Sequence, residues 1–174
     1  MSNSPPPEAG GHQENNGWVY RYMHDEKEKK AAVDTTALYE NLFKADSLDQ
    51  FIQTNTGELQ IPQFHFFITE LCKTRGEVPE RVIKRGGIEN SFGHQLFSGR
   101  RKPSRDTVIQ LAFGFEADVE LAQTLLKYAR RSQLYPRIKR DAAILYCLYN
   151  HLSFLNVQEV LYDLGLPLLG ESRT

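Results

Sequence analysis

Residues 78–115, "VPERVIKRGGIENSFGHQLFSGRRKPSRDTVIQLAFGF", decide the fold of this chain. Short amphipathic segments follow one another here and are interrupted by glycines, which is typical of short helices joined by tight turns. One helix is expected to end before Gly87, a second at Ser98-Gly99, and a third to run from Ser104 to Gly114. The stretch therefore predicts a compact series of helices rather than strands.

The flanking sequence continues the helical pattern in both directions. On the N-terminal side, "DTTALYENLFKA" and "SLDQFIQTN" predict two short amphipathic helices, and "IPQFHFFITELCKTRG" predicts a longer one that stops at Gly76. On the C-terminal side, helices are expected after Asp118 and, beyond a turn at Pro136, in a final pair that ends at Gly165. Since no stretch alternates polar and apolar residues as a strand would, the chain is predicted to be all-α.

The turn at Gly87 gives the central stretch a more specific meaning. Two short helices joined by such a turn match the arrangement by which a helix-turn-helix places its second helix in the major groove of DNA, although this spacing alone is weak evidence. Arg100, Arg101 and Lys102 follow that second helix, and Pro103 restricts the loop that carries them. Cations at this position lie where such folds pass over a phosphate strand, although a basic run can also be an ordinary solvated loop.

The charge of the chain is unevenly distributed. The net charge is −1, which by itself gives no sign of a polyanionic partner. Residues 1–72 hold five Lys or Arg against eleven Asp or Glu, whereas residues 73–105 hold nine against three. The basic excess therefore lies in the segment of the helix-turn-helix, as expected for a nucleic-acid-binding surface.

The central stretch resembles the DNA-binding core of XRE-family regulators, the Cro and phage-repressor type, and aligns with that pattern without a gap. The resemblance extends over residues 64–130. Gly87 falls at the family's turn glycine, Gly99 at the glycine that closes the recognition helix, and Pro103-Ser104 at the start of the next helix. The segments "LYPRIKRDA" and "VLYDLGLPLL" resemble the C-terminal helical cap of small bacterial regulators of this family.

These patterns divide the chain into four parts. Residues 1–33 begin with a segment rich in Pro, Gly, Asn and Ser and are expected to be a disordered tail and linker. Residues 34–60 are an N-terminal helical pair, 61–130 the helix-turn-helix DNA-binding core, and 131–174 a C-terminal helical cap. The resemblance implies an all-α, lambda-repressor-like helix-turn-helix bundle with flanking N- and C-terminal helices.

The resemblance also implies which residues contact DNA. The helix around residues 89–98 is expected to read base edges in the major groove through Asn90, Ser91, His94 and Gln95. Amide side chains suit paired hydrogen bonds with adenine, and Ser and His can contact several base edges. Phosphate contacts are expected at Ser98, Arg100, Arg101, Lys102 and Arg105.

Two alternatives are open for this helix. Asn90 or Ser91 can serve as its N-cap instead of contacting a base. Gly93 and Phe97 depart from the family pattern, and with Phe92 they predict a helix that packs on a slightly rotated face, where Gly93 admits another side chain or backbone closely. The groove-facing set would then shift by one position.

Other chemistry has little support in the sequence. Cys72 and Cys147 imply no disulfide framework and fit a reducing cytosol. His151 follows Cys147 at a spacing that two metal ligands on a helix would use, but no third ligand is evident nearby. No phosphate-cradling glycine loop or nucleophile motif is present, and no apolar run approaches the roughly 20 residues of a membrane span. We therefore expect a cytoplasmic protein that is not an enzyme, holds no metal or cofactor, and does not enter a membrane.

Two functions from different classes fit these features. The first is a sequence-specific DNA-binding transcriptional regulator, with double-stranded DNA as its partner and a homodimer as its form, because one short helix reads too few bases. The alternative is a protein–protein interaction adaptor on the same scaffold, which would use apolar Phe92 and Phe97 and the C-terminal "YDLGLPLL". Burial of "LYCLY" and "LPLL" within one subunit would favour the regulator, whereas an exposed apolar groove there would favour a dimer interface or a partner site.

Overall fold

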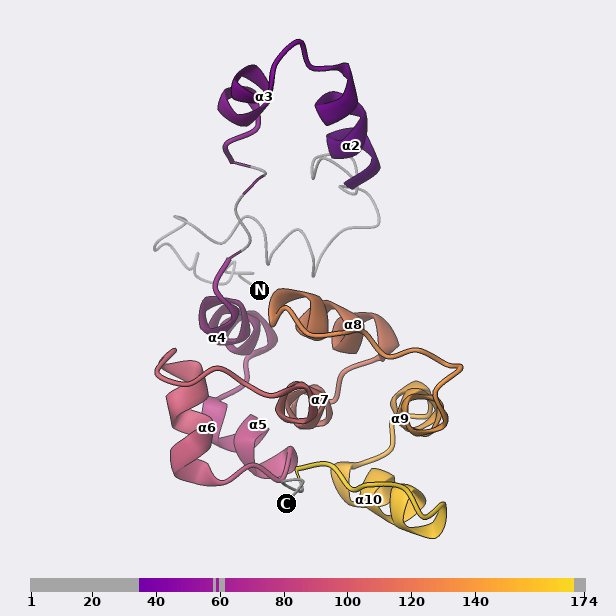
Figure 1. Cartoon of the computed structure of the whole chain (residues 1–174). Helices are drawn as coiled ribbons and strands as arrows, with labels where there is room; N and C mark the ends of the chain where they lie inside the picture. The colour runs from indigo at the N-terminus through magenta and orange to yellow at the C-terminus, as the bar shows by residue number, and fades with distance from the viewer. Residues whose placement is uncertain (1–34, 58, 60–61, 171–174) are drawn as a thin grey trace, which may run out of the picture.

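The structure is a computed structural model that describes residues 35–57, 59 and 62–170. Within these ranges the chain forms nine α-helices and no strand, which confirms the predicted all-α class (Figure 1). The tail and linker predicted for residues 1–33 lie outside the described residues. The helices are α2 (Thr35–Lys44), α3 (Leu48–Thr54), α4 (Phe64–Arg75), α5 (Pro79–Arg85), α6 (Asn90–Phe97), α7 (Arg105–Gly114), α8 (Val119–Tyr128), α9 (Lys139–Tyr149) and α10 (Phe154–Asp163). None of these helices is long and apolar enough to cross a membrane.

Capping side chains fix several helix boundaries where the sequence predicts them. Ser104 begins α7 by accepting a hydrogen bond from the Thr107 backbone N–H at 3.1 Å, and Asp118 begins α8 by accepting one from Leu121 at 2.8 Å. These bonds satisfy backbone donors that have no partner inside the helix. The predicted stop of α4 at Gly76 is also confirmed, with the glycine in the left-handed conformation.

The helices form a short N-terminal pair and a larger body. Figure 1 shows α2 and α3 beside each other, apart from the body made of α4 to α10. Phe51 is the buried residue of α3, while Phe43 of α2 and Leu48 of α3 are exposed. The main hydrophobic core begins at Phe67 and takes all its buried members from the body.

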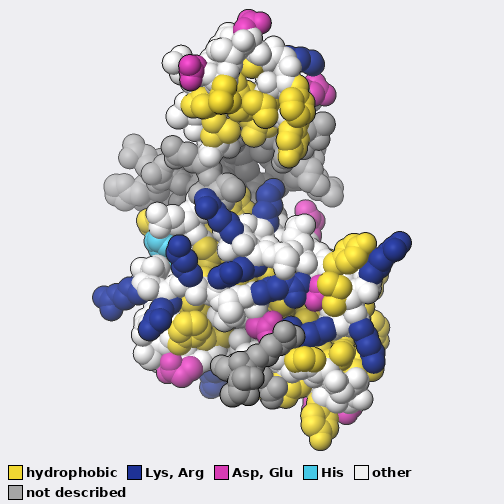
Figure 2. All heavy atoms as spheres, viewed as in Figure 1, with side chains coloured by type: hydrophobic (Ala, Val, Ile, Leu, Met, Phe, Trp, Pro, Cys, Tyr) yellow, Lys and Arg dark blue, Asp and Glu magenta, His cyan; other side chains and the backbone are white. Residues whose placement is uncertain are grey.

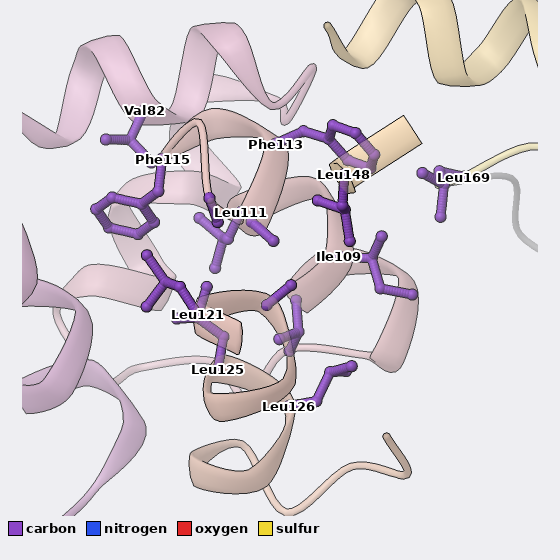
Figure 3. Packing of buried hydrophobic residues seen from close by; sticks show 14 of the residues in the cluster. Val82, Ile109, Leu111, Phe113, Phe115, Leu121, Leu125, Leu126, Leu148 and Leu169 are labelled. Carbon is purple, nitrogen blue, oxygen red and sulfur yellow. The ribbon is translucent and has the colours of Figure 1, made fainter. Parts of the chain in front are cut away.

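Helix α7 lies at the centre of the body. Every residue from Thr107 to Gly114 is buried, because α7 is covered on several sides by α5, α8 and α10. Figure 3 shows Leu111 of α7 and Leu121 and Leu125 of α8 pointing into the same space. Leu148 and Leu169 belong to the same core, so one core extends across the boundary predicted near residue 130.

Two crossed ion pairs join α7 to α9. The guanidinium of Arg105 donates to both carboxylate oxygens of Asp141 at 3.0 and 2.8 Å. In return, Arg140 donates to both oxygens of Asp106 at 2.9 and 2.8 Å. An Arg-Asp dipeptide at the start of each helix therefore pairs with the Arg-Asp dipeptide of the other. Bidentate pairs of this kind fix orientation as well as distance.

The segment after α10 folds back onto the body. Arg140 donates to the carbonyl oxygens of Pro167 at 2.8 Å and Leu168 at 3.0 Å. The side chain of Gln158 exchanges two hydrogen bonds with the backbone of Leu169, which is buried. "LPLL" is therefore held within one subunit, whereas Tyr146 and Tyr149 of "LYCLY" are exposed.

Candidate nucleic-acid interface

The turn between α5 and α6 depends on Gly87. Its φ is +63°, in the left-handed region that favours glycine. A Cβ at this position would lie 2.1 Å from Cε1 of Phe154, at the start of α10. The turn is also held by Gln110 of α7, whose side-chain amide donates to the carbonyl oxygens of Gly86 and Gly87. Helices α10 and α7 therefore both fix the turn that sets the orientation of α6 relative to α5.

Helix α6 packs on α5 through Gly93. A Cβ added to Gly93 would lie 2.6 Å from both Cγ1 and Cγ2 of Ile83, so only a residue without a side chain allows this approach. The prediction that Gly93 admits another side chain closely is confirmed. Leu96 is buried beside it, and Phe92 and Phe97 are half-buried against the core. The buried face of α6 is therefore centred on Gly93 and Leu96.

The N-cap of α6 is Glu89, not Asn90 or Ser91 as the alternative had it. Its carboxylate accepts hydrogen bonds from the backbone N–H groups of Ser91 at 2.8 Å and Phe92 at 2.7 Å. These two bonds lower the pKa of Glu89, with the bond from Phe92 as the larger cause. Because the Glu89 carboxylate accepts the backbone N–H groups at the start of α6, the side chains of Asn90 and Ser91 are not needed to cap the helix.

The polar residues predicted to contact bases lie together on the side of α6 away from the core. Asn90, Ser91 and His94 are exposed and Gln95 is half-buried. Nε2 of His94 lies 3.7 Å from a carboxylate oxygen of Glu80 at the start of α5, and Oε1 of Gln95 accepts a long 3.4 Å contact from Arg101. The side chains of Asn90 and Ser91 make no hydrogen bond to the described residues, which leaves their polar atoms open to a ligand.

The cations after α6 lie on a loop anchored at both ends. We call residues 99–103 the basic loop. Gly99 has φ +75° and packs against the ring of His65, while Pro103 is buried and its carbonyl oxygen accepts bonds of 3.0 and 2.7 Å from the Arg131 guanidinium. Arg100, Arg101 and Lys102 between them are exposed. The loop therefore presents its charges from a fixed backbone.

Among the described residues, the basic loop has no acidic partner. No carboxylate in the described ranges lies within 4.0 Å of a charged nitrogen of Arg100, Arg101 or Lys102. Figure 2 shows Lys and Arg side chains spread across the visible face of the α4 to α10 body. Unpaired, exposed cations on an ordered loop suit phosphate contacts, because little further ordering is needed on binding.

Two further residues from the predicted phosphate set lie in different surroundings. The hydroxyl of Ser98 at the end of α6 is exposed and donates to the Gln95 carbonyl oxygen at 3.3 Å. Arg105 instead directs its guanidinium into the protein, to Asp141 and to the carbonyl oxygens of Ser132 at 2.9 Å and Gln133 at 3.0 Å. With these donors occupied, Arg105 holds α7 to α9 and is not available to a phosphate without breaking that junction.

The end of α8 lies beside the basic loop, which sequence reasoning missed. Arg131 reaches the loop through its bonds to Pro103. Arg130 has φ +54°, a conformation usually taken by glycine after the end of a helix. The signal in the sequence is an "ARR" that closes a helical pattern where a glycine would be expected. The structure thus adds Arg131 to the neighbourhood of the basic loop.

The two cysteines lie inside the protein and not on the exposed polar face of α6. Cys72 and Cys147 are both buried, and burial raises the pKa of Cys72 to about 12 and also raises that of Cys147. Helix α9 ends at Tyr149, so the helical spacing considered for Cys147 and His151 is not formed. Among the described residues no group of three or more His, Cys, Asp or Glu is arranged to hold a metal ion.

Comparison of the chain with protein-family models, with curated proteins and with solved structures finds no match. The case for a function therefore rests on the geometry of α5, α6 and the basic loop.

Proposed function

We propose that the chain is a cytoplasmic, sequence-specific DNA-binding regulator of the XRE type that acts as a dimer. One observation carries the proposal: the polar face of α6 is exposed beside three cations on an anchored loop, and none of the three pairs with a carboxylate in the described part of the chain. A polar helix face suits base edges in the major groove, and the adjacent cations suit the phosphate strand that borders it.

The base-reading set in this proposal is Asn90, Ser91, His94 and Gln95. Their exposure supports the choice, because Asn90, Ser91 and His94 are exposed and Gln95 is half-buried, on the side of α6 away from Gly93 and Leu96. Asn90 and Ser91 lie at the first turn of α6, the end of a recognition helix that enters the groove in several helix-turn-helix proteins.

The proposed phosphate-contacting residues differ from the set predicted from the sequence at two positions. Arg100, Arg101 and Lys102 remain in it, with Ser98 at the end of α6. Arg105 is left out because its guanidinium holds Asp141. Arg130 joins it, because the neighbouring Arg131 ties the end of α8 to the basic loop.

The alternative of a protein-binding adaptor has less support at α6. Phe92 and Phe97, which that function would use, pack against the core. The C-terminal segment is likewise tied down through Arg140 and Gln158.

The proposal is tested by selection from a random-sequence DNA library. Full-length protein is expected to retain DNA more weakly as salt increases, and the retained fraction should be enriched in a common sequence. Failure to enrich any sequence, together with weak binding at low salt, would reject the regulator in favour of the adaptor.

A further inference from the structure

Helix α9 has two apolar faces, and only one of them is covered by the body. Ile144, Cys147 and Leu148 face the core and are buried. A second row of apolar side chains runs along the outer side at helical spacing. We call this row the α9 ridge, and it comprises Ile138, Ala142, Leu145, Tyr146 and Tyr149. Ala142 and Leu145 are half-buried, and Leu145 also packs against the core. Ile138 is 52% exposed, Tyr146 62% and Tyr149 77%.

The covered face already accounts for the place of α9 in the fold, so the α9 ridge needs a separate explanation. No charged side chain occurs from Ala142 to Tyr149, which is unusual for the solvent side of a helix. Figure 1 shows α9 on the other side of α7 from α6. A partner on the ridge would therefore leave the polar face of α6 uncovered. An exposed apolar row of this kind marks an interaction site.

The charges at the two ends of α9 indicate what the partner is. Arg137 and Lys139 are exposed at the start of the helix, the end where cations are unfavourable because the backbone N–H groups already carry positive charge. Neither residue forms an ion pair with the described residues. The other end of α9 offers a complement in the exposed ring of Tyr149, because the face of an aromatic ring attracts a cation.

An antiparallel second copy of α9 satisfies both ends at once. It brings Lys139 of each copy to Tyr149 and the carboxyl end of the other α9. The same register sets the small Ala142 against the large Tyr146 of the other copy and brings the two Leu145 side chains close to the symmetry axis. A two-fold interface requires this self-complementarity, in which one surface fits a rotated copy of itself.

We propose that the α9 ridge is the dimer interface of this protein, with α9 of a second copy as its antiparallel partner. The inference rests on the dimeric form in the proposed function, but it does not depend on DNA binding. Such a dimer carries one α6 on each outer side, away from the contact between the two copies.

Sedimentation analysis of the full-length protein without DNA tests this surface. Wild-type protein is expected to dimerise in the micromolar range. Tyr146→Glu with Tyr149→Glu should raise the dimer Kd by about 100-fold or more, because four carboxylates would meet in an apolar contact. Tyr162→Glu is the matched control, since Tyr162 is 74% exposed on α10 and lies outside the ridge. It should leave the Kd nearly unchanged, and thermal unfolding checks that each variant is folded.

Cross-linking tests the register. Under mild oxidation, Ala142→Cys with Tyr146→Cys should give a covalent dimer, whereas Tyr162→Cys should not. The proposal is overturned by wild-type protein that stays monomeric, or by a dimer that Tyr162→Glu weakens as much as the ridge variant does. A dimer that fails to bind DNA would reject the regulator and leave this surface intact, and a monomer that binds DNA would do the reverse.

Discussion

The basic loop and the junction between α7 and α9 are both rich in arginine, but they treat the charge in opposite ways. Arg100 and Arg101 in the loop are exposed and have no carboxylate partner among the described residues. Arg105, a few residues later, donates two hydrogen bonds to Asp141, and Arg140 donates two to Asp106. Arginines that are close in the sequence thus differ: Arg100 and Arg101 pair with no described carboxylate, whereas Arg105 joins α7 to α9.

A basic segment can therefore be interpreted from the partners of its cations. Removing an exposed cation that has no protein partner changes the stability of the fold little, because the cation was solvated by water and no other group loses a partner. Removing a paired one leaves its buried partner uncompensated, and that penalty falls on stability. Stability and DNA affinity therefore separate the two regions.

Arg105→Ala gives the largest expected effect. It leaves Asp141, which is 2% exposed, with the backbone N–H of Tyr135 as its remaining hydrogen bond in the described structure. We expect a loss of about 3 kcal/mol in the free energy of unfolding. Arg100→Ala is the matched control and should change stability by less than about 0.5 kcal/mol. Equal losses in denaturant unfolding would remove the distinction between the two regions.

Gly87→Ala tests the contact between Phe154 of α10 and the turn that joins α5 to α6. The left-handed backbone costs alanine about 1–2 kcal/mol, and the clash with Phe154 adds about 1–3 kcal/mol. In a Phe154→Ala background the second cost should largely disappear. A double-mutant cycle measured by chemical unfolding gives this coupling, and additive effects would show that α10 does not restrain the turn.

Gln95→Ala is expected to act on DNA alone. Loss of its base contact should weaken the preferred site by about 1–3 kcal/mol while affinity for random DNA stays the same. Asn90→Ala should behave alike and leave stability unchanged, because Glu89 holds the cap. Gln53→Ala, on exposed α3, is the control. If both α6 variants keep the wild-type ratio of specific to random binding, the reading face is misassigned.

Glu89→Gln gives the smallest effect, and its sign depends on pH. The folded state lowers the pKa of Glu89, so its carboxylate favours folding above the ordinary value of 4.5. This contribution is lost as pH falls through the lowered pKa. The thermal midpoint of Glu89→Gln should therefore lie below that of wild type at neutral pH, and the gap should close in acid. A gap that does not change with pH would exclude an electrostatic cap.

The sequence predicted what local chemistry determines. Ser104, Asp118 and Gly76 mark helix ends because capping depends on residues within one turn. The close approach at Gly93 was also predicted, since only glycine leaves such a space, but its partner Ile83 depends on how α5 and α6 cross.

Side-chain pairs between helices that are far apart in the chain could not be predicted from the sequence. Arg105 and Asp141 are far apart in the chain, and Arg105 looks the same as its basic neighbours until α9 is placed. The repeated Arg-Asp dipeptide was the available signal. Glu89 was missed as the N-cap because Asn90 and Ser91 beside it are residues that caps usually prefer.

The salt dependence of DNA binding tests whether the basic loop contacts phosphates. For Arg100→Ala with Arg101→Ala, the slope of log affinity against log salt should flatten by up to about 2, since each lost phosphate contact releases about 0.9 fewer counterions. Lys44→Ala with Lys73→Ala removes two exposed cations that already pair with glutamates and should leave the slope unchanged. An unchanged slope in the Arg100 and Arg101 variant would contradict a phosphate-binding basic loop.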